Sequence, residues 1–221
     1  MKPVIIVNFK TYRKATGKAA LKMAIMHDKV AMKTGVRIMI AVQNQDLSVI
    51  SKSVSIPVMA EHADAVKYGA HTGKVLPENL KANGAWGVLV NHAEDRITDS
   101  ELKKVVKRCS EAGLKTVICT GDMKKLSGII RMKPYAIAYE EPELIGTGRA
   151  ISKMKPESVR MFAQRVRKSG RSLPLCGAGI SGAKDLKAAI DLGTTGVLVS
   201  SAITKAKDPE KRLMEFASAL N

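Results

Sequence analysis

Three side chains that could move protons or stabilise charge stand just past short apolar runs. They are the carboxylate of Glu140, the imidazole of His92 and the ammonium of Lys10. A base, an acid and a cation of these types suit abstraction of a proton beside a carbonyl better than hydrolysis. Each has a plainer interpretation, because an acidic residue before glycines is often an ordinary turn, and lysines or histidines at strand ends are often only solvated or hydrogen-bonded.

Other chemistries lack their residue patterns in this chain. No serine or cysteine that could act as a nucleophile has a base at motif spacing, and the four histidines and three cysteines form no metal-ligand pattern. We therefore expect no metal site.

Two turns of small residues are candidates for binding an anion. Gly177-Ala178-Gly179-Ile180-Ser181-Gly182 follows one apolar run and Ser200-Ser201 follows another, and a helix is predicted after each. Free backbone N–H groups in such turns and at helix starts favour anions. Glycine-rich turns are common, so the motif alone is weak, but its position after the last two strands favours a phosphorylated ligand.

Eight short apolar runs predict the strands that position these residues. They cover 4–7, 36–42, 58–60, 87–90, 116–119, 135–138, 173–176 and 196–199. Helices are predicted at 16–33, from 77, and at 100–112, 123–132, 155–168, 183–192 and 209–220. Leu102, Val105, Val106 and Cys109, for example, form one helical stripe.

Strands that alternate with helices or long crossovers predict an α/β fold with a closed (β/α)8 barrel. No Pro, Ser or Gly-rich linker divides residues 1–221, so we expect a single domain. An open doubly wound sheet is the alternative, but it more often ends near five or six strands, and no GxGxxG motif follows the first strand. In a barrel the loops after the strands share one face, which would bring together Asn8, Lys10, His92, Glu94 and Glu140.

The net charge of +17 could indicate a nucleic-acid partner or an anionic substrate. Lys103, Lys104, Lys107 and Arg108 lie opposite the apolar stripe of their helix, which favours a solvated face. Aromatic residues are only 4% of the chain and are not interleaved with the basic ones, so we expect no nucleic-acid partner.

Cysteine usage and hydropathy predict a cytoplasmic protein without a membrane partner. Cys109, Cys119 and Cys176 lie in apolar surroundings, as reduced, buried thiols do. The first apolar run is too short for a signal peptide, and no window approaches the roughly 18 apolar residues of a membrane span.

A long connection runs from Glu61 to Pro77 and includes Thr72. Long connections inside compact domains tend to carry function or an interface.

Taken together, these motifs resemble the triosephosphate isomerase family in its short, archaeal-type form. The resemblance rests on ordered segments that run from the first strand to the last. They are Asn8-Phe9-Lys10, Gly69 to Val75, Asn91-His92-Ala93-Glu94, Ala138-Tyr139-Glu140, Ile145-Gly146-Thr147-Gly148 and Cys176 to Ile180. The stretch between His92 and Glu140 is shorter than in the bacterial and eukaryotic enzymes, which indicates the compact form.

The resemblance implies an isomerase of glycolysis and gluconeogenesis that interconverts dihydroxyacetone phosphate and D-glyceraldehyde 3-phosphate. Glu140 would be the base, His92 a neutral electrophile and Lys10 the cation beside the enediolate; the pairing of a Glu base with a neutral His is a known property of this enzyme. Asn8 would orient the substrate, and Glu94 would support Lys10. Neither a metal nor a cofactor is implied.

The resemblance also assigns the phosphate site, a lid and an interface. Residues 141–147 would close as a lid, with Ile145 and Gly146 against the substrate. Phosphate contacts are implied for Gly177, Ala178, Gly179, Ser200 and Ser201. The loop with Thr72 would reach a neighbouring copy and support its lysine, in a homo-oligomer that is either a dimer or a tetramer.

Three residues depart from the family pattern. Glu141 follows the base where proline is usual, Ser200-Ser201 replaces a glycine-containing pair, and Ala93 stands where serine is common. We expect these changes to tune the rate, and only Glu140 of the Glu140-Glu141 pair to be essential. Two alternatives stay open: another phosphate-binding barrel, which would not explain Asn8, Lys10, His92 and Glu140, and a basic scaffold, which rests on charge alone.

Overall fold

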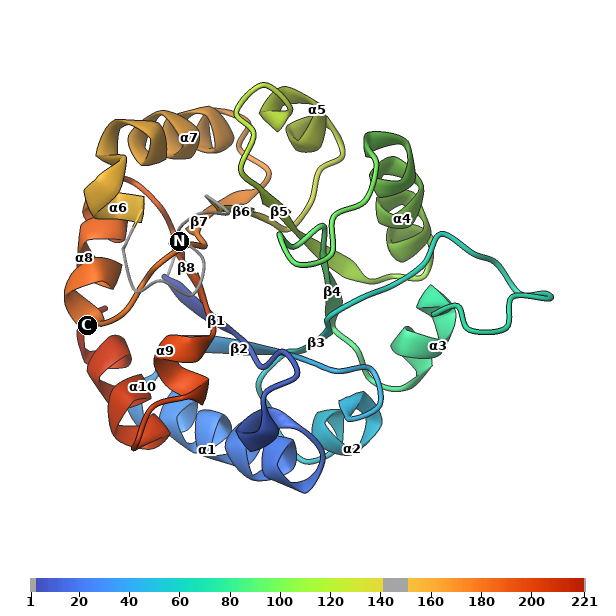
Figure 1. The fold of residues 1–221 in the computed structure, drawn as a ribbon, viewed down its shortest axis with the longest axis horizontal. Coiled ribbons are helices and arrows are strands. Elements are labelled where there is room, and N and C mark those ends of the chain that lie inside the picture. The colour runs from blue at the N-terminus through green and yellow to red at the C-terminus, as the bar shows by residue number, and fades with distance from the viewer. Residues whose placement is uncertain (1–2, 141–150, 221) are drawn as a thin grey trace.

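A closed barrel of eight parallel strands forms the centre of a computed structural model of the chain, which describes residues 3–140 and 151–220 (Figure 1). The strands are β1 (Val4–Asn8), β2 (Arg37–Val42), β3 (Val58–Ala60), β4 (Gly87–Val90), β5 (Lys115–Thr120), β6 (Ala136–Tyr139), β7 (Leu173–Cys176) and β8 (Gly196–Val199). Each pairs with the next, and β8 pairs with β1. The predicted barrel is confirmed.

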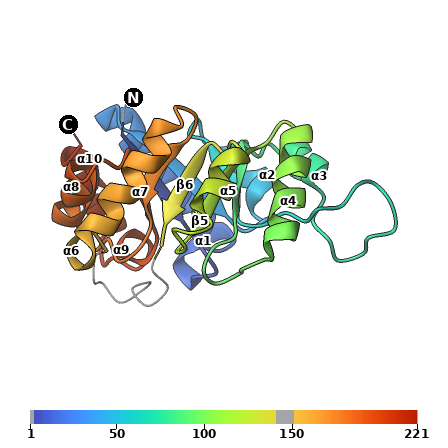
Figure 2. The same ribbon diagram turned by 90° about the horizontal axis from the view of Figure 1, so that it is seen from above.

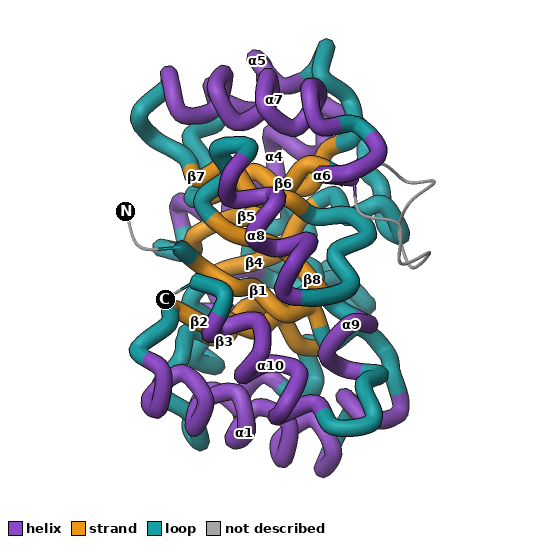
Figure 3. The backbone as a smooth tube through the Cα atoms, turned by 90° about the vertical axis from the view of Figure 1, so that its left-hand side faces the viewer, coloured by secondary structure: helices purple, strands orange, loops and turns teal. Residues whose placement is uncertain are grey.

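Helices surround the strands in an outer ring (Figures 1 and 3). They are η1 (Arg13–Ala15), α1 (Lys18–Thr34), α2 (Leu47–Ser51), α3 (Pro77–Ala82), α4 (Asp99–Glu111), α5 (Leu126–Arg131), α6 (Ile151–Met154), α7 (Pro156–Lys168), α8 (Ala183–Asp191), α9 (Ser201–Thr204) and α10 (Pro209–Ser218). The short helices η1, α2 and α6 were not predicted. The predicted start of α1 at Thr16 was wrong by two residues, because Gly17, with φ 59°, separates η1 from the helix.

The barrel has two apolar layers because the strands are buried on both faces. In β1, Val4 and Ile6 belong to the inner cluster, whereas Ile5 and Val7 pack against the helices. In β6, Ala136 and Ala138 are inner residues, so the side chain two positions further on faces the same side. That residue is Glu140.

The barrel closes where the backbones of β8 and β1 lie very near each other. Gly196 pairs with Val4 of β1, and a Cβ added at Gly196 would lie 2.0 Å from the carbonyl oxygen of Val4. Only glycine, here with φ 156°, allows this contact.

The connection from Glu61 to Pro77 projects from the side of the barrel between β3 and α3 (Figures 1 and 2). Asp64 and Val75 pair at its base, and residues 67–74 are exposed. The predicted long connection is confirmed, and we refer to residues 64–75 as the protruding loop.

Arg108 corrects the prediction of a solvated helix face. Its guanidinium is buried under the base of the protruding loop, where Nε donates to the carbonyl of Val66 at 2.9 Å. The same group pairs with Glu78 and Glu111. A basic residue on the polar side of an amphipathic helix was indistinguishable in sequence from its solvated neighbours, because its partners come from distant segments.

The three cysteines are free and buried, as predicted. None of the helices in the described ranges has the length and apolar composition that a membrane crossing requires.

Candidate active site

A cavity of about 390 Å³ opens at the carboxyl ends of the strands. Its lining includes nine of the predicted site residues: Asn8, Lys10, His92, Glu94, Glu140, Gly177, Gly179, Ser200 and Ser201. They lie at or just after the carboxyl ends of β1, β4, β6, β7 and β8, so the parallel barrel brings together residues separated by most of the chain.

Other predicted residues lie elsewhere. Ala178 is buried beside the cavity and does not line it. Thr72 is exposed on the protruding loop. Ile145 and Gly146 lie outside the described residues, as do Glu141 and the rest of the predicted lid at 141–147.

Lys10 and Glu94 form an ion pair at the cavity wall. The distance from Lys10 Nζ to Glu94 Oε1 is 2.6 Å, and the lysine side chain is only 12% exposed. Lys10 has a left-handed backbone, with φ 51°, and its N–H donates to Asn8 Oδ1 at 3.0 Å. Asn8 thus stabilises an unfavourable backbone conformation that aims the ammonium into the site. This direct contact is consistent with the predicted support of Lys10 by Glu94.

His92 has a hydrogen-bond pattern that indicates its tautomer. The backbone N–H of Glu94 donates to Nδ1 at 3.1 Å, so Nδ1 is an acceptor and the proton belongs on Nε2. Burial, and then the charge of Lys10, lower the pKa of His92 to about 4. The imidazole is therefore neutral at pH 7 and presents an N–H donor.

Glu140 is a buried carboxylate that faces this donor. Its Oε1 lies 3.5 Å from His92 Nε2, and its Oε2 accepts from the backbone N–H of Ala93 at 3.3 Å. Burial raises the pKa of Glu140 to about 7, although the thiol of Cys119, the Ala93 N–H and the charge of Lys10 oppose that rise. A carboxylate with this pKa can both take and return a proton near neutral pH.

Gly177 makes room for the Glu140 side chain. A Cβ added at Gly177 would lie 2.8 Å from Glu140 Cγ and 3.3 Å from Ala138 Cβ. The glycine-rich turn after β7 therefore has a packing function beside the base as well as its predicted backbone contacts.

Ser200 contributes a hydroxyl that is buried at the cavity wall. Its Oγ has no hydrogen-bond partner among the described residues. A buried hydroxyl that is free to donate suits an anionic oxygen in the cavity. The same region of the wall includes Gly177, Gly179 and Ser201, whose turns supply backbone N–H groups.

Sequence reasoning missed several lining residues. They are Tyr12, Leu198, Val199 and Ala202. Tyr12 continues the alternation of Asn8 and Lys10, so its spacing could have indicated it. Ile180 and Ser181 also line the cavity, and they belong to the glycine-rich turn that was predicted to bind an anion. The backbone contact of Ala93 with Glu140 carries no side-chain signal.

The cavity offers a neutral imidazole donor, a carboxylate base and an ammonium within one partly enclosed space. Within residues 3–140 and 151–220, no group of three or more His, Cys, Asp and Glu side chains could hold a metal ion. The geometry supports reversible proton transfer on a small anionic carbonyl compound.

Comparison with known proteins agrees with this chemistry. The family model "Triosephosphate isomerase" matches residues 3–219. The triosephosphate isomerase of Methanobacterium bryantii is 44% identical over 219 residues, which cover 99% of this chain and 97% of that relative. Those of Methanothermus fervidus and Pyrobaculum calidifontis are 42% and 43% identical, each over 99% of this chain and 99% and 96% of their own lengths.

Proposed function

The chain belongs to the triosephosphate isomerase family, whose enzymes interconvert dihydroxyacetone phosphate and glyceraldehyde 3-phosphate, and from this premise we propose that Glu140 is the base of the reaction. Glu140 would take a proton from the carbon beside the carbonyl of dihydroxyacetone phosphate and return it to the neighbouring carbon. The observation that carries the proposal is the buried carboxyl group of Glu140. Its pKa is raised to about 7, and its Oε1 lies 3.5 Å from His92 Nε2.

His92 would polarise the substrate carbonyl through its Nε2–H. As the proton leaves carbon, negative charge moves to oxygen, and a neutral imidazole can donate a proton there and recover it from the adjacent hydroxyl. The low pKa of His92 and the hydrogen bond at Nδ1 support this assignment. No atom or electron is gained or lost over the whole reaction.

Lys10 would stabilise the enediolate by charge. Its pairing with Glu94 places the ammonium at the cavity wall before substrate binds, so little reorganisation is needed. We propose that Asn8 helps to orient the substrate, and that Glu94 supports Lys10.

The phosphate of the substrate would lie against the turns after β7 and β8. The Ser200 hydroxyl, which has no hydrogen-bond partner in the part of the chain that the structure describes, supports this location, as do the backbone of Gly177 and Gly179 and Ser201. We further propose that the enzyme serves glycolysis and gluconeogenesis, as the family's reaction implies.

The decisive experiment is an isomerase assay of the wild type and Glu140→Gln with both triose phosphates. We expect kcat of the variant to fall by at least about 10³-fold, because the amide cannot accept the proton. Equal activity of the two proteins would refute the assignment of the base. An inactive, folded wild type would refute the function itself.

A further inference from the structure

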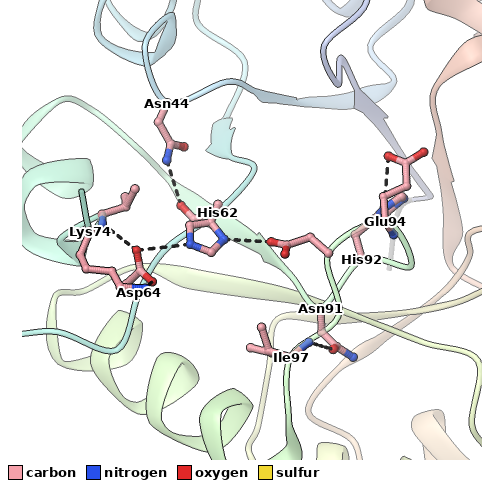
Figure 4. A network of polar contacts seen from close by, with 10 residues as sticks. Asn44, His62, Asp64, Lys74, Asn91, His92, Glu94 and Ile97 are labelled. Atoms are coloured by element: carbon pink, nitrogen blue, oxygen red, sulfur yellow. Dashed lines mark hydrogen bonds and ion pairs between the residues drawn. The ribbon is translucent and has the colours of Figure 1, made fainter.

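His62 lies between the protruding loop and the loop after β4, outside the cavity. Its Nδ1 is 3.0 Å from Asp95 Oδ2, and its Nε2 is 3.3 Å from Asp64 Oδ2 (Figure 4). Carboxylate oxygens accept hydrogen bonds, so a ring nitrogen that carries a proton can donate to the carboxylate that it faces. The carbonyl of His62 also accepts from Asn44 Nδ2 at 3.3 Å, which ties in the segment after β2.

Asp64 is well anchored on its own side of this contact. Its Oδ1 pairs with Lys74 at 3.1 Å, and its Oδ2 accepts from the backbone N–H of Val75 at 2.7 Å. The pKa of Asp64 lies below its ordinary value despite burial, because these donors and His62 favour the charged form. The base of the protruding loop is thus a fixed support for His62.

The loop after β4 has little packing of its own. Glu94 and Asp95 have side chains 57% and 64% exposed, and Arg96 is also exposed. The loop begins at Asn91, a left-handed residue with φ 60°. Segments with few buried contacts open locally at low cost, so this loop depends on polar tethers.

Besides the contacts of Glu94 with Lys10 and of Ala93 with Glu140, polar contacts of Asn91 and His62 tether the loop. Asn91 donates to the carbonyl of Cys119 at 2.9 Å and accepts from the N–H of Ile97 at 3.2 Å, which fixes the two ends of the loop. The middle is a turn in which the N–H of Asp95 donates to the carbonyl of His92 at 2.9 Å. Outside the loop, His62 contacts the Asp95 side chain of this turn.

We propose that His62 is a positioning residue, which holds the His92–Asp95 turn through Asp95 and so fixes the orientation of the His92 imidazole. The inference rests on the proposed isomerase function. The turn also contains the Glu94 N–H that donates to His92 Nδ1, the bond that directs the Nε2 proton into the cavity. Release of Asp95 would loosen that bond without touching the phosphate site.

A double-mutant cycle of His62→Ala and Asp95→Ala tests the contact. We expect each single change to lower kcat about fivefold with KM within about twofold, because His92 acts mainly on the transition state. The double variant should be no slower than the slower single variant, since one tether is lost in each case. His62→Gln, whose amide can donate to Asp95, should recover part of kcat.

Asp99→Ala and Lys125→Ala are the matched controls. Their ion pair is also exposed, at 2.7 Å, but joins α4 to the segment before α5 and does not touch the turn. Both should keep the wild-type kcat. The proposal would be overturned if the double variant lost the full sum of the two single effects on kcat, counted as free energies, or if His62→Ala kept the wild-type kcat.

The ¹⁵N chemical shifts of the His92 ring provide a second, independent measurement. The wild type should show one tautomer with the proton on Nε2, and His62→Ala should show a mixture, whereas unchanged shifts would contradict the positioning role. If the wild type isomerises triose phosphates and Glu140→Gln does not, a silent His62→Ala refutes this inference alone. If the wild type is inactive, the proposed function fails, and the shifts still decide on the tether.

Discussion

The raised pKa that suits Glu140 to act as a base also lowers the stability of the fold. Its folded-state pKa of about 7 lies above the ordinary 4.5, so folding favours the protonated form. Stability that is present below the unfolded pKa is therefore lost as pH rises from about 4.5 through 7. The base destabilises the fold at the pH at which it works.

Glu140→Gln should be more stable than the wild type at high pH, while it loses activity. Between pH 4.5 and pH 8, the unfolding free energy of the variant should gain about 3 kcal/mol over that of the wild type, because glutamine does not ionise. Urea unfolding at both pH values measures this gain. Glu101→Gln, at an exposed position, should show no such change, and a constant difference for Glu140→Gln would contradict the assigned pKa.

Gly177→Ala should disturb the base without altering any chemical group. The added methyl would lie 2.8 Å from Glu140 Cγ, so the carboxylate must shift. We expect kcat to fall about 10- to 100-fold, since misplacement of a base by about 1 Å has an effect of this size. Steady-state kinetics measure it. Gly128→Ala, where the nearest atom is 4.0 Å away, should be active, and normal kcat in Gly177→Ala would show that the turn adapts.

At the scale of elements, α1 packs a histidine against the barrel. His27 is fully buried beside Phe9, with ring centroids 5.3 Å apart. Its Nδ1 lies 2.7 Å from the carbonyl of Met23, and burial lowers the pKa of His27 to about 4. The neutral ring fits this layer and the charged ring does not.

The packing of His27 predicts acid sensitivity of α1. Its folded pKa lies below the ordinary 6.5, so stability that is full above pH 6.5 is lost as pH falls towards 4. By pH 4.5 the burial of His27 should lower the free energy of unfolding by about 2–3 kcal/mol relative to its value at neutral pH. His27→Met should remove that part of the pH dependence. Unfolding titrations at pH 7.5 and 4.5 test it, with the exposed His71→Gln as the control. An equal change of unfolding free energy with pH in the wild type and His27→Met would contradict this prediction.

The elements that sequence predicted best were those buried on both sides. Each strand contains a short apolar run, and β1 was misjudged only at its end, where Asn8 pairs with β2 although it is polar. Short helices such as α2 and α6 have too few residues to show a period. Helix ends were set by local backbone, as at Gly17, which composition does not reveal.

The site was predictable where chemistry resides in side chains at strand ends. Lys10, His92 and Glu140 share a cavity because parallel strands end on one face. Backbone donors such as Ala93 N–H and space such as that above Gly177 leave no residue-type signal. His62 was hidden for a related reason, because its partner Asp95 comes from another loop.

At the scale of the whole molecule, the protruding loop leaves residues 67–74 exposed, including Tyr68, which is 77% exposed. We expect this loop to pack against a second copy, because an exposed aromatic on a long loop favours an interface. Light scattering should give a dimer or tetramer for the wild type, and Tyr68→Asp should shift the equilibrium towards smaller species. Tyr135→Phe, at a partly buried tyrosine packed against the inner layer of the barrel, should not shift it. A monomeric wild type would rule the interface out.

The alternation of inner and outer residues in β6 limits how the gene can change length. Ala136, Ala138 and Glu140 face one side because their spacing is even, so loss or gain of a single codon between them would turn the carboxylate into the helix layer. Between Glu61 and Pro77 no such parity exists, and codons can be added or lost there without reversing any strand. Length variation among descendants of this sequence should therefore accumulate in the protruding loop and be purged from β6.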